Sequence, residues 1–147
     1  MMKATMQIRE LARRLRRADE GQALVEFALV VPFLLVFIVG IVEFGRAWNM
    51  HQVLTDAARE GARVAVVDNG TIALTTVENT VKRGIATAGA NAELATITVT
   101  GLNGNTDTPA TVEVALPYRF LFFGELKKWT TGESTVMLRT KFTMRNE

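Results

Sequence analysis

The hydrophobic and polar positions divide the chain into a basic start, one long apolar run and a patterned remainder. Residues 27–42 carry no charged side chain and are bounded by Glu26 and Glu43. As a helix, residues 22–42 would span about 31 Å, which matches the roughly 30 Å hydrocarbon thickness of a bilayer. We therefore predict a transmembrane helix over residues 22–43. The alternative is a buried core helix, but the rest of this short chain is too polar to enclose a helix that is apolar on every side.

Helical patterning continues beyond the apolar run, since residues 43–67 contain no proline. We expect one helix over residues 22–67, about 69 Å long, whose part beyond the membrane forms a stalk. Small side chains recur at helical spacing on adjoining ridges of this stalk, at Ala57, Ala58, Gly61, Ala62 and Ala65. They would let another backbone approach closely. Two partners remain open, the protein's own folded part and a neighbouring subunit.

A turn is predicted at residues 68–70, and a second helix follows it. Apolar residues recur on one face of that helix, at Leu74, Val77, Val81, Ile85 and Ala88. Thr75 and Glu78 have the spacing of a capping box at its start. A helix with a single apolar face must pack against another element.

Three later segments alternate apolar and polar residues with the period of a β-strand, at residues 95–100, 111–118 and 134–142. The glycine- and asparagine-containing residues 101–105 predict an antiparallel hairpin between the first two. The predicted fold class is α+β. A long N-terminal transmembrane helix continues as a stalk and packs, with the second helix, on a small three-stranded antiparallel sheet.

The segment between the second and third strands is unusually apolar, with Phe120, Leu121, Phe122 and Phe123 in a row. Lys127, Lys128 and Trp129 follow, and these residue types suit a lipid headgroup boundary. Two interpretations remain open. The aromatic residues pack beneath the long helix, or they form an adhesive surface for a partner or a membrane leaflet.

Composition argues against an enzyme. The 147 residues include one histidine, His51, and no cysteine, which excludes a disulfide framework, a thiolate metal site and a cysteine nucleophile. Ser134 is the only serine and begins a predicted strand, and no nucleophile elbow, phosphate loop or metal-spaced carboxylate cluster is present. We predict no catalytic residues, no cofactor and no metal.

The net charge of +2 is unevenly distributed. Residues 1–21 hold six basic and three acidic side chains, so the positive-inside rule keeps the N-terminus in the cytoplasm and sends the remainder across the membrane. This basic stretch contains no interleaved aromatic residues, which favours a role in topology over nucleic-acid binding. We expect Glu43, Arg46, Trp48 and Trp129 to act as anchors at the membrane interface.

The boundary before the apolar run has an unusual pattern. No small-residue cleavage site of an ordinary secretory signal follows Val42. Instead Gly21 closes the basic leader, and Glu26 stands five residues later at the start of the membrane helix. A lone carboxylate in lipid costs several kcal/mol, so Glu26 needs a partner. The alternative is that Glu26 snorkels to the interface and Gly21 is an ordinary linker residue.

The string GQALVEFALVVPFLLVFIVGIVEFGRAW, followed by LTDAAREGARVAVV, resembles the TadE-like proteins, pseudopilins of the tight-adherence (Flp) pilus assembly system. The resemblance covers residues 21–67. It implies a pilin-like fold and a prepilin leader that a prepilin peptidase removes between Gly21 and Gln22. It further implies that Glu26 docks subunits in the membrane by pairing with the α-amine of a neighbour.

These observations predict four regions: a basic prepilin leader (1–21), a transmembrane helix (22–43), a periplasmic helical extension (44–68) and a small α+β periplasmic head (69–147). The function implied is that of a minor pilin or pseudopilin supporting pilus biogenesis and surface adhesion, single-pass in the inner membrane. The implied partners are the prepilin peptidase, other pilins, inner-membrane platform proteins and the lipid bilayer. The alternative is an uncleaved, singly anchored periplasmic binding protein.

Overall fold

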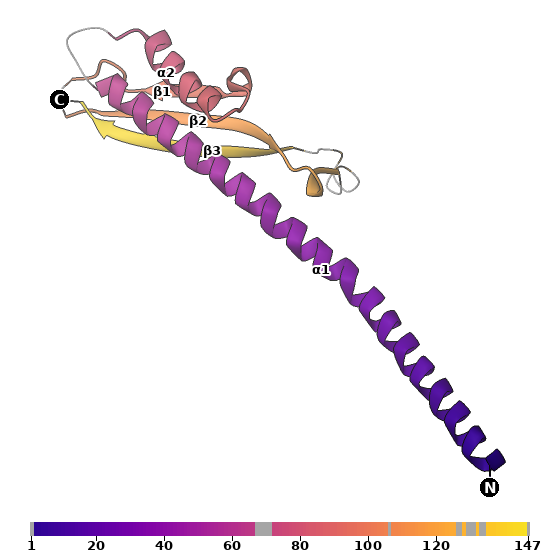
Figure 1. Cartoon of the computed structure of the whole chain (residues 1–147). Coiled ribbons are helices and arrows are strands. Elements are labelled where there is room, and N and C mark those ends of the chain that lie inside the picture. Colours follow the sequence, from indigo (N-terminus) through magenta and orange to yellow (C-terminus); the bar gives the residue numbers. More distant parts are fainter. Residues whose placement is uncertain are drawn as a thin grey trace. The chain divides into compact units, whose positions relative to one another are not determined.

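The computed structural model of the chain describes residues 2–66, 72–105, 107–125, 128, 132 and 135–146, with side chains from residue 21 onward. In chain order the elements are helix α1 (Met2–Val66), helix α2 (Leu74–Thr87), a short 3-10 helix η1 (Ala92–Leu94) and strands β1 (Thr96–Thr100), β2 (Pro109–Arg119) and β3 (Thr135–Arg145) (Figure 1). The chain divides into unit 1 (Met1–Val42) and unit 2 (Glu43–Glu147). The predicted α+β fold class is confirmed. The predicted turn at 68–70 lies outside the described residues, as do Lys127, Trp129 and Ser134.

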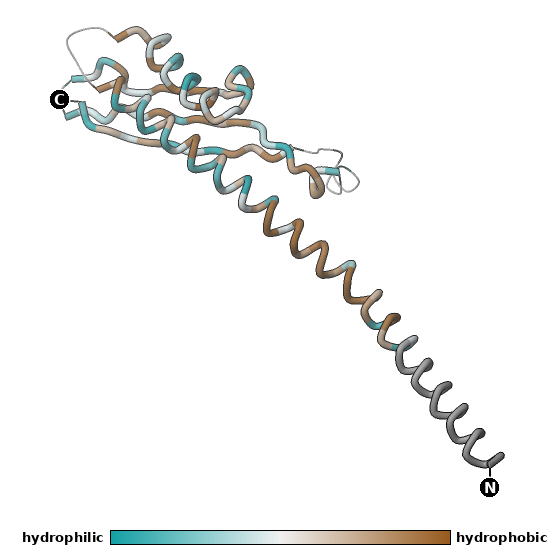
Figure 2. The backbone as a smooth tube through the Cα atoms, viewed as in Figure 1, coloured by the Kyte–Doolittle hydropathy of each residue, from teal (hydrophilic) through white to brown (hydrophobic). Residues whose placement is uncertain are grey.

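In unit 1 the helix starts earlier than the sequence pattern predicted. α1 begins at Met2 instead of Gln22, because residues 2–20 contain no glycine or proline and are rich in alanine, leucine, arginine and glutamate, which favour helix. Gly21 costs about 1 kcal/mol within a helix but does not interrupt this one. Figure 2 shows the apolar run as a long brown stretch of α1.

Unit 2 contains one antiparallel sheet in the order β1-β2-β3. The predicted hairpin between the first two strands is therefore confirmed. One face of the sheet carries apolar residues in register across the strands: Ile97 pairs with Val114, Val99 with Val112, and Leu116 with Leu138. The C-terminal part of α1 and the whole of α2 lie on this face (Figure 1). The opposite face is formed largely by exposed polar residues such as Thr98, Glu113 and Lys141.

Helix α2 has the apolar face that its periodicity predicted, but it begins differently. Val77, Val81 and Ile85 are buried. Leu74 stays 46% exposed because it lies in the first turn, at the edge of the contact. The predicted capping box is wrong: Ala73 is the N-cap and makes no side-chain hydrogen bond. The helix starts too early for the Thr75 hydroxyl to occupy the capping position.

The connection between β1 and β2 depends on one glycine and one buried asparagine. Gly101 has a φ of +74°, and a Cβ there would lie 2.1 Å from the carbonyl oxygen of Pro109, so a side chain is excluded. The Asn146 amide donates to the carbonyl oxygens of Gly101 and Thr108 at 3.2 and 3.0 Å. These bonds tie Asn146, which follows β3, to the β1–β2 loop at this end of the sheet.

Candidate functional site

The membrane-spanning segment is the first part of the candidate site. Among the described residues, one helix is long and apolar enough to cross a bilayer, over Gly21–Val66, and its most apolar window is entirely unburied. Phe27 and Phe37 are 67% and 72% exposed. Such exposure is costly in water and disagrees with the buried core helix that was the alternative. The helix fits a single-pass membrane anchor.

Gly21 and Glu26 lie at the start of this segment. Both are exposed, and no other atom lies within 4 Å of the position where a Cβ of residue 21 would be. Within the part of the chain that the structure describes, Glu26 has no ion-pair or hydrogen-bond partner. The carboxylate is therefore free to meet a group from another molecule.

Glu43, the first residue of unit 2, is the most buried charged side chain of those described. Its side chain is 3% exposed, and its Oε1 accepts from the Arg46 guanidinium at 3.4 Å. Its Oε2 is buried with no hydrogen-bond partner. The spacing of three residues on a helix allows the pair with Arg46, but the role of interface anchor expected for Glu43 gave no reason to expect its burial. A signal for the burial was present, because Glu43 shares one helical face with Ala47, Leu54 and Ala58, all buried.

Trp48 stands on an exposed aromatic stripe of α1. It is 58% exposed, and its ring centroid lies 6.2 Å from Phe44 and 6.3 Å from His51. Residues spaced by three or four positions on a helix stack in this way. Large exposed aromatic side chains just beyond an apolar span are typical of the lipid headgroup region. The other proposed anchor, Trp129, lies outside the described residues.

The small residues of α1 pack against the protein's own sheet and second helix. Ala58 and Ala62 are fully buried, Ala57 and Ala65 nearly so, and all four belong to the core of unit 2. A Cβ at Gly61 would lie 2.5 Å from Cγ2 of Val81. The structure thus places this stripe against the protein's own folded part, the first of the two partners that the sequence left open.

The apolar segment after β2 is not part of that core. Leu121 and Phe122 are 59% and 65% exposed, so packing beneath the long helix is wrong for these two residues. Phe120 is half-buried and meets the Tyr118 ring edge-on at 5.2 Å. The sequence pattern could not decide this, because aromatic residues in a row carry no periodicity that assigns one face to the core.

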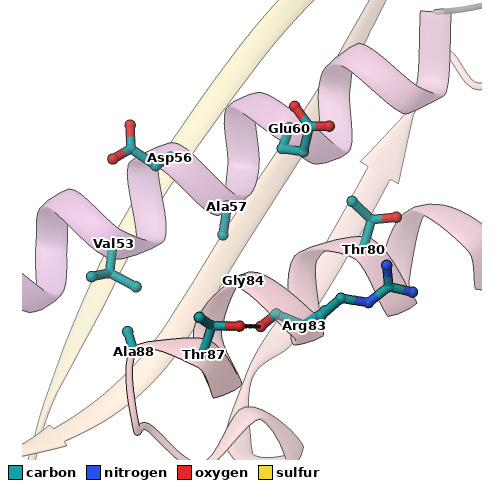
Figure 3. A pocket seen from close by; sticks show the side chains of 9 residues that line it. All are labelled: Val53, Asp56, Ala57, Glu60, Thr80, Arg83, Gly84, Thr87 and Ala88. Atoms are coloured by element: carbon teal, nitrogen blue, oxygen red, sulfur yellow. Dashed lines mark hydrogen bonds between the residues drawn. The ribbon is translucent and has the colours of Figure 1, made fainter.

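A groove of about 510 Å³ lies between α1 and α2 (Figure 3). Asp56 and Glu60 line it from α1, and Thr80, Arg83 and Thr87 line it from α2. Asp56 and Glu60 already pair with Arg59 and Arg63 on their own helix, at 3.6 and 3.4 Å. The Thr87 hydroxyl donates to the Arg83 carbonyl oxygen. The groove brings acidic and basic groups near each other without a nucleophile next to a base.

Two contacts that sequence reasoning did not identify hold α1 against β3. The Thr55 and Thr140 hydroxyl oxygens lie 3.2 Å apart, and the Arg59 guanidinium stacks over the Phe142 ring at 5.1 Å from its centroid. Both join residues far apart in the chain, so helical spacing alone could not reveal them. Among the described residues there is no group of three metal-ligating side chains.

The described residues form an α+β fold with one apolar helix that fits a single-pass membrane anchor. Residues 21–63 match the family model TadE, described as TadE-like protein, which confirms the resemblance seen in the sequence. No curated protein and no solved structure matches the chain. The match indicates involvement in a Tad pilus system, and the TadE-like family is pilus-associated and not a known enzyme family.

Proposed function

We propose that the protein is a minor pilin or pseudopilin of a tight-adherence (Flp) pilus that supports pilus biogenesis and surface adhesion. It is made with a leader over residues 1–21, which a prepilin peptidase removes between Gly21 and Gln22. Residues 22–43 hold it in the inner membrane, residues 44–68 extend into the periplasm, and residues 69–147 form the periplasmic head. Its partners are the peptidase, other pilins and inner-membrane platform proteins.

One observation carries this proposal: the family match starts at Gly21, directly before the unburied apolar part of α1, which has a single carboxylate near its start. The six basic side chains before Gly21 favour a cytoplasmic leader. A glycine lets the backbone leave the helix and enter a narrow protease site without a side chain. No chemistry is required of the head, which acts by contact.

Processing is tested by the intact mass and N-terminal sequence of the protein purified from its own membranes. We expect the wild-type chain to begin at Gln22 and the Gly21→Lys variant to keep its leader, because a long charged side chain at the scissile bond obstructs the peptidase. Ala18→Lys is the matched control, with the same added charge three residues upstream, and should be processed normally. A mature chain that begins at Met1 or Met2, in cells that contain the peptidase, would favour the uncleaved anchored protein.

Glu26 is tested separately from cleavage. We expect Glu26→Gln to be processed normally but to lose cross-linking to other pilus components in intact membranes. The amide cannot form the ion pair with a neighbour's α-amine that offsets the cost of a charge in lipid. Glu20→Gln, which removes a carboxylate from the leader only, is the control. Unchanged cross-linking of the processed Glu26→Gln protein would show that the carboxylate does not dock subunits.

A further inference from the structure

Two apolar side chains that follow β2 do not pack in the core of unit 2. Leu121 and Phe122 are 59% and 65% exposed. The residue before them is fixed, because Phe120 packs edge-on against Tyr118 at the end of β2, with ring planes at 82°. The strand end is therefore anchored while the next two side chains face outward. Adjacent exposed apolar residues at an anchored strand end indicate a contact with something outside the chain.

Contacts within unit 2 place the segment after β2 level with Glu43, the first residue of that unit. Thr55 meets Thr140 and Arg59 meets Phe142, so α1 and β3 run in the same direction. From Thr55 back to Glu43, α1 covers about 18 Å. The same distance back along β3 takes about five residues and reaches Thr135, which pairs with Arg119 at the end of β2. The segment after Arg119 thus lies level with Glu43.

Glu43 directly follows Val42, the last residue of the apolar run. Phe44 and Trp48, at the same level of unit 2, are 67% and 58% exposed and stack on each other. Lys128, further along the segment after β2, is exposed as well. Aromatic and basic residues are enriched where a protein meets lipid headgroups. Two parts of unit 2 that are far apart in the chain therefore present interfacial residue types at one level.

We propose that Leu121 and Phe122 insert into the surface of the same bilayer that the apolar helix spans. Unit 2 then contacts the membrane at two places, the end of the span and the segment after β2. A lipid surface fits better than a protein partner. An aromatic side chain buries roughly 150–250 Å², so two side chains fall well short of the ~800 Å² that each partner of a stable complex contributes. The proposal requires the membrane anchor but not leader cleavage.

The chain has no cysteine, so single cysteines can carry an environment-sensitive nitrobenzoxadiazole label at chosen positions. The full chain is reconstituted in phosphatidylethanolamine–phosphatidylglycerol vesicles, with or without lipids that carry a nitroxide near the headgroup. Leu121→Cys is compared with Leu74→Cys, an exposed leucine at the opposite end of unit 2. That end is marked by the Ile72 amide donating to the Asn103 side chain near the β1–β2 connection. Val36→Cys reports insertion of the span.

We expect blue-shifted emission and nitroxide quenching at position 121, and neither at position 74. Emission and quenching at 121 that match those at 74, while position 36 is in lipid, would overturn the proposal. A blue shift at 121 without quenching would also overturn it, because a protein surface would then cover the segment. A label at position 36 outside lipid would refute the membrane anchor, and the docking with it. None of these outcomes depends on whether the leader is cleaved.

A second substitution tests whether the quenching at position 121 comes from insertion of the segment and not from the affinity of the label itself for lipid. Phe122→Asp in the labelled Leu121→Cys protein should abolish nitroxide quenching at position 121, because a carboxylate resists entry into lipid. Leu94→Asp changes a residue that is 55% exposed elsewhere in unit 2 and should leave quenching unchanged. Quenching that survives Phe122→Asp would show that the segment does not insert through these side chains.

Discussion

Gly61→Leu is expected to destabilise unit 2 by forcing a side chain into the packed contact between α1 and α2. A Cβ at position 61 would lie 2.5 Å from Cγ2 of Val81, with Val112 and Val77 close behind it at 3.5 and 3.6 Å. Val81 is a stiff β-branched residue that is fully buried, so neither side can yield. Even small insertions into a packed core cost about 1–3 kcal/mol, and better helix propensity returns only about 1 kcal/mol. The helices must separate to admit the leucine.

The measurement is hydrogen–deuterium exchange of the β2 amides in the full chain, held in detergent micelles. Exchange in Gly61→Leu should be faster throughout β2, because the strand lies directly beneath the helix contact. Gly45→Leu is the matched control, since no other atom lies within 4 Å of a Cβ there. The β2 amides of the Gly45→Leu variant should be as protected from exchange as in the wild-type chain, or slightly more. Equal protection of β2 in both variants would mean that α1 and α2 do not pack through Gly61.

Leu54→Ala is also expected to have a large effect, a loss of about 2–5 kcal/mol in the free energy of unfolding. Leu54 is completely buried and belongs to the core cluster that joins α1 to α2 and β2. Its truncation removes apolar burial and leaves a cavity that surrounding elements fill only in part. For a domain of this size, each kcal/mol lowers the melting temperature by roughly 4–8 °C.

Thermal unfolding followed by near-ultraviolet circular dichroism tests this expectation, with Leu74→Ala as the control. The same substitution at position 74 removes a side chain that is 46% exposed and should change stability by less than about 0.5 kcal/mol. A melting temperature of Leu54→Ala close to that of Leu74→Ala would contradict the assignment of Leu54 to the core.

Local pattern was sufficient to predict the secondary structure of unit 2 because its elements obey their own periods. Val77, Val81 and Ile85 recur at helical spacing and are buried. Val112, Val114 and Leu116 of β2 are buried as predicted, and the strands pair as expected. Element ends were less predictable. The prediction of a capping box at Thr75 was wrong because α2 begins two residues earlier, with Ala73 as its N-cap.

For the candidate site, too, some features were predictable from the sequence and others were not. The apolar span and the placement of Gly21 and Glu26 before it follow from the order of residue types, since a bilayer selects for length and hydrophobicity alone. What each side chain contacts could not be predicted. Glu43 is buried although it is charged, and Leu121 is exposed although it is apolar.

By itself, the sequence determined that this protein has a segment long and apolar enough to span a membrane, a basic start and an α+β remainder, because length, charge and period act locally along the chain. Only the tertiary structure decided which side chains contact each other. The small-residue stripe of α1 packs on its own head because Val81 and Val112, distant in sequence, fill the space beside Gly61. Packing depends on the simultaneous fit of several surfaces. The residue pattern of one segment describes only one of these surfaces.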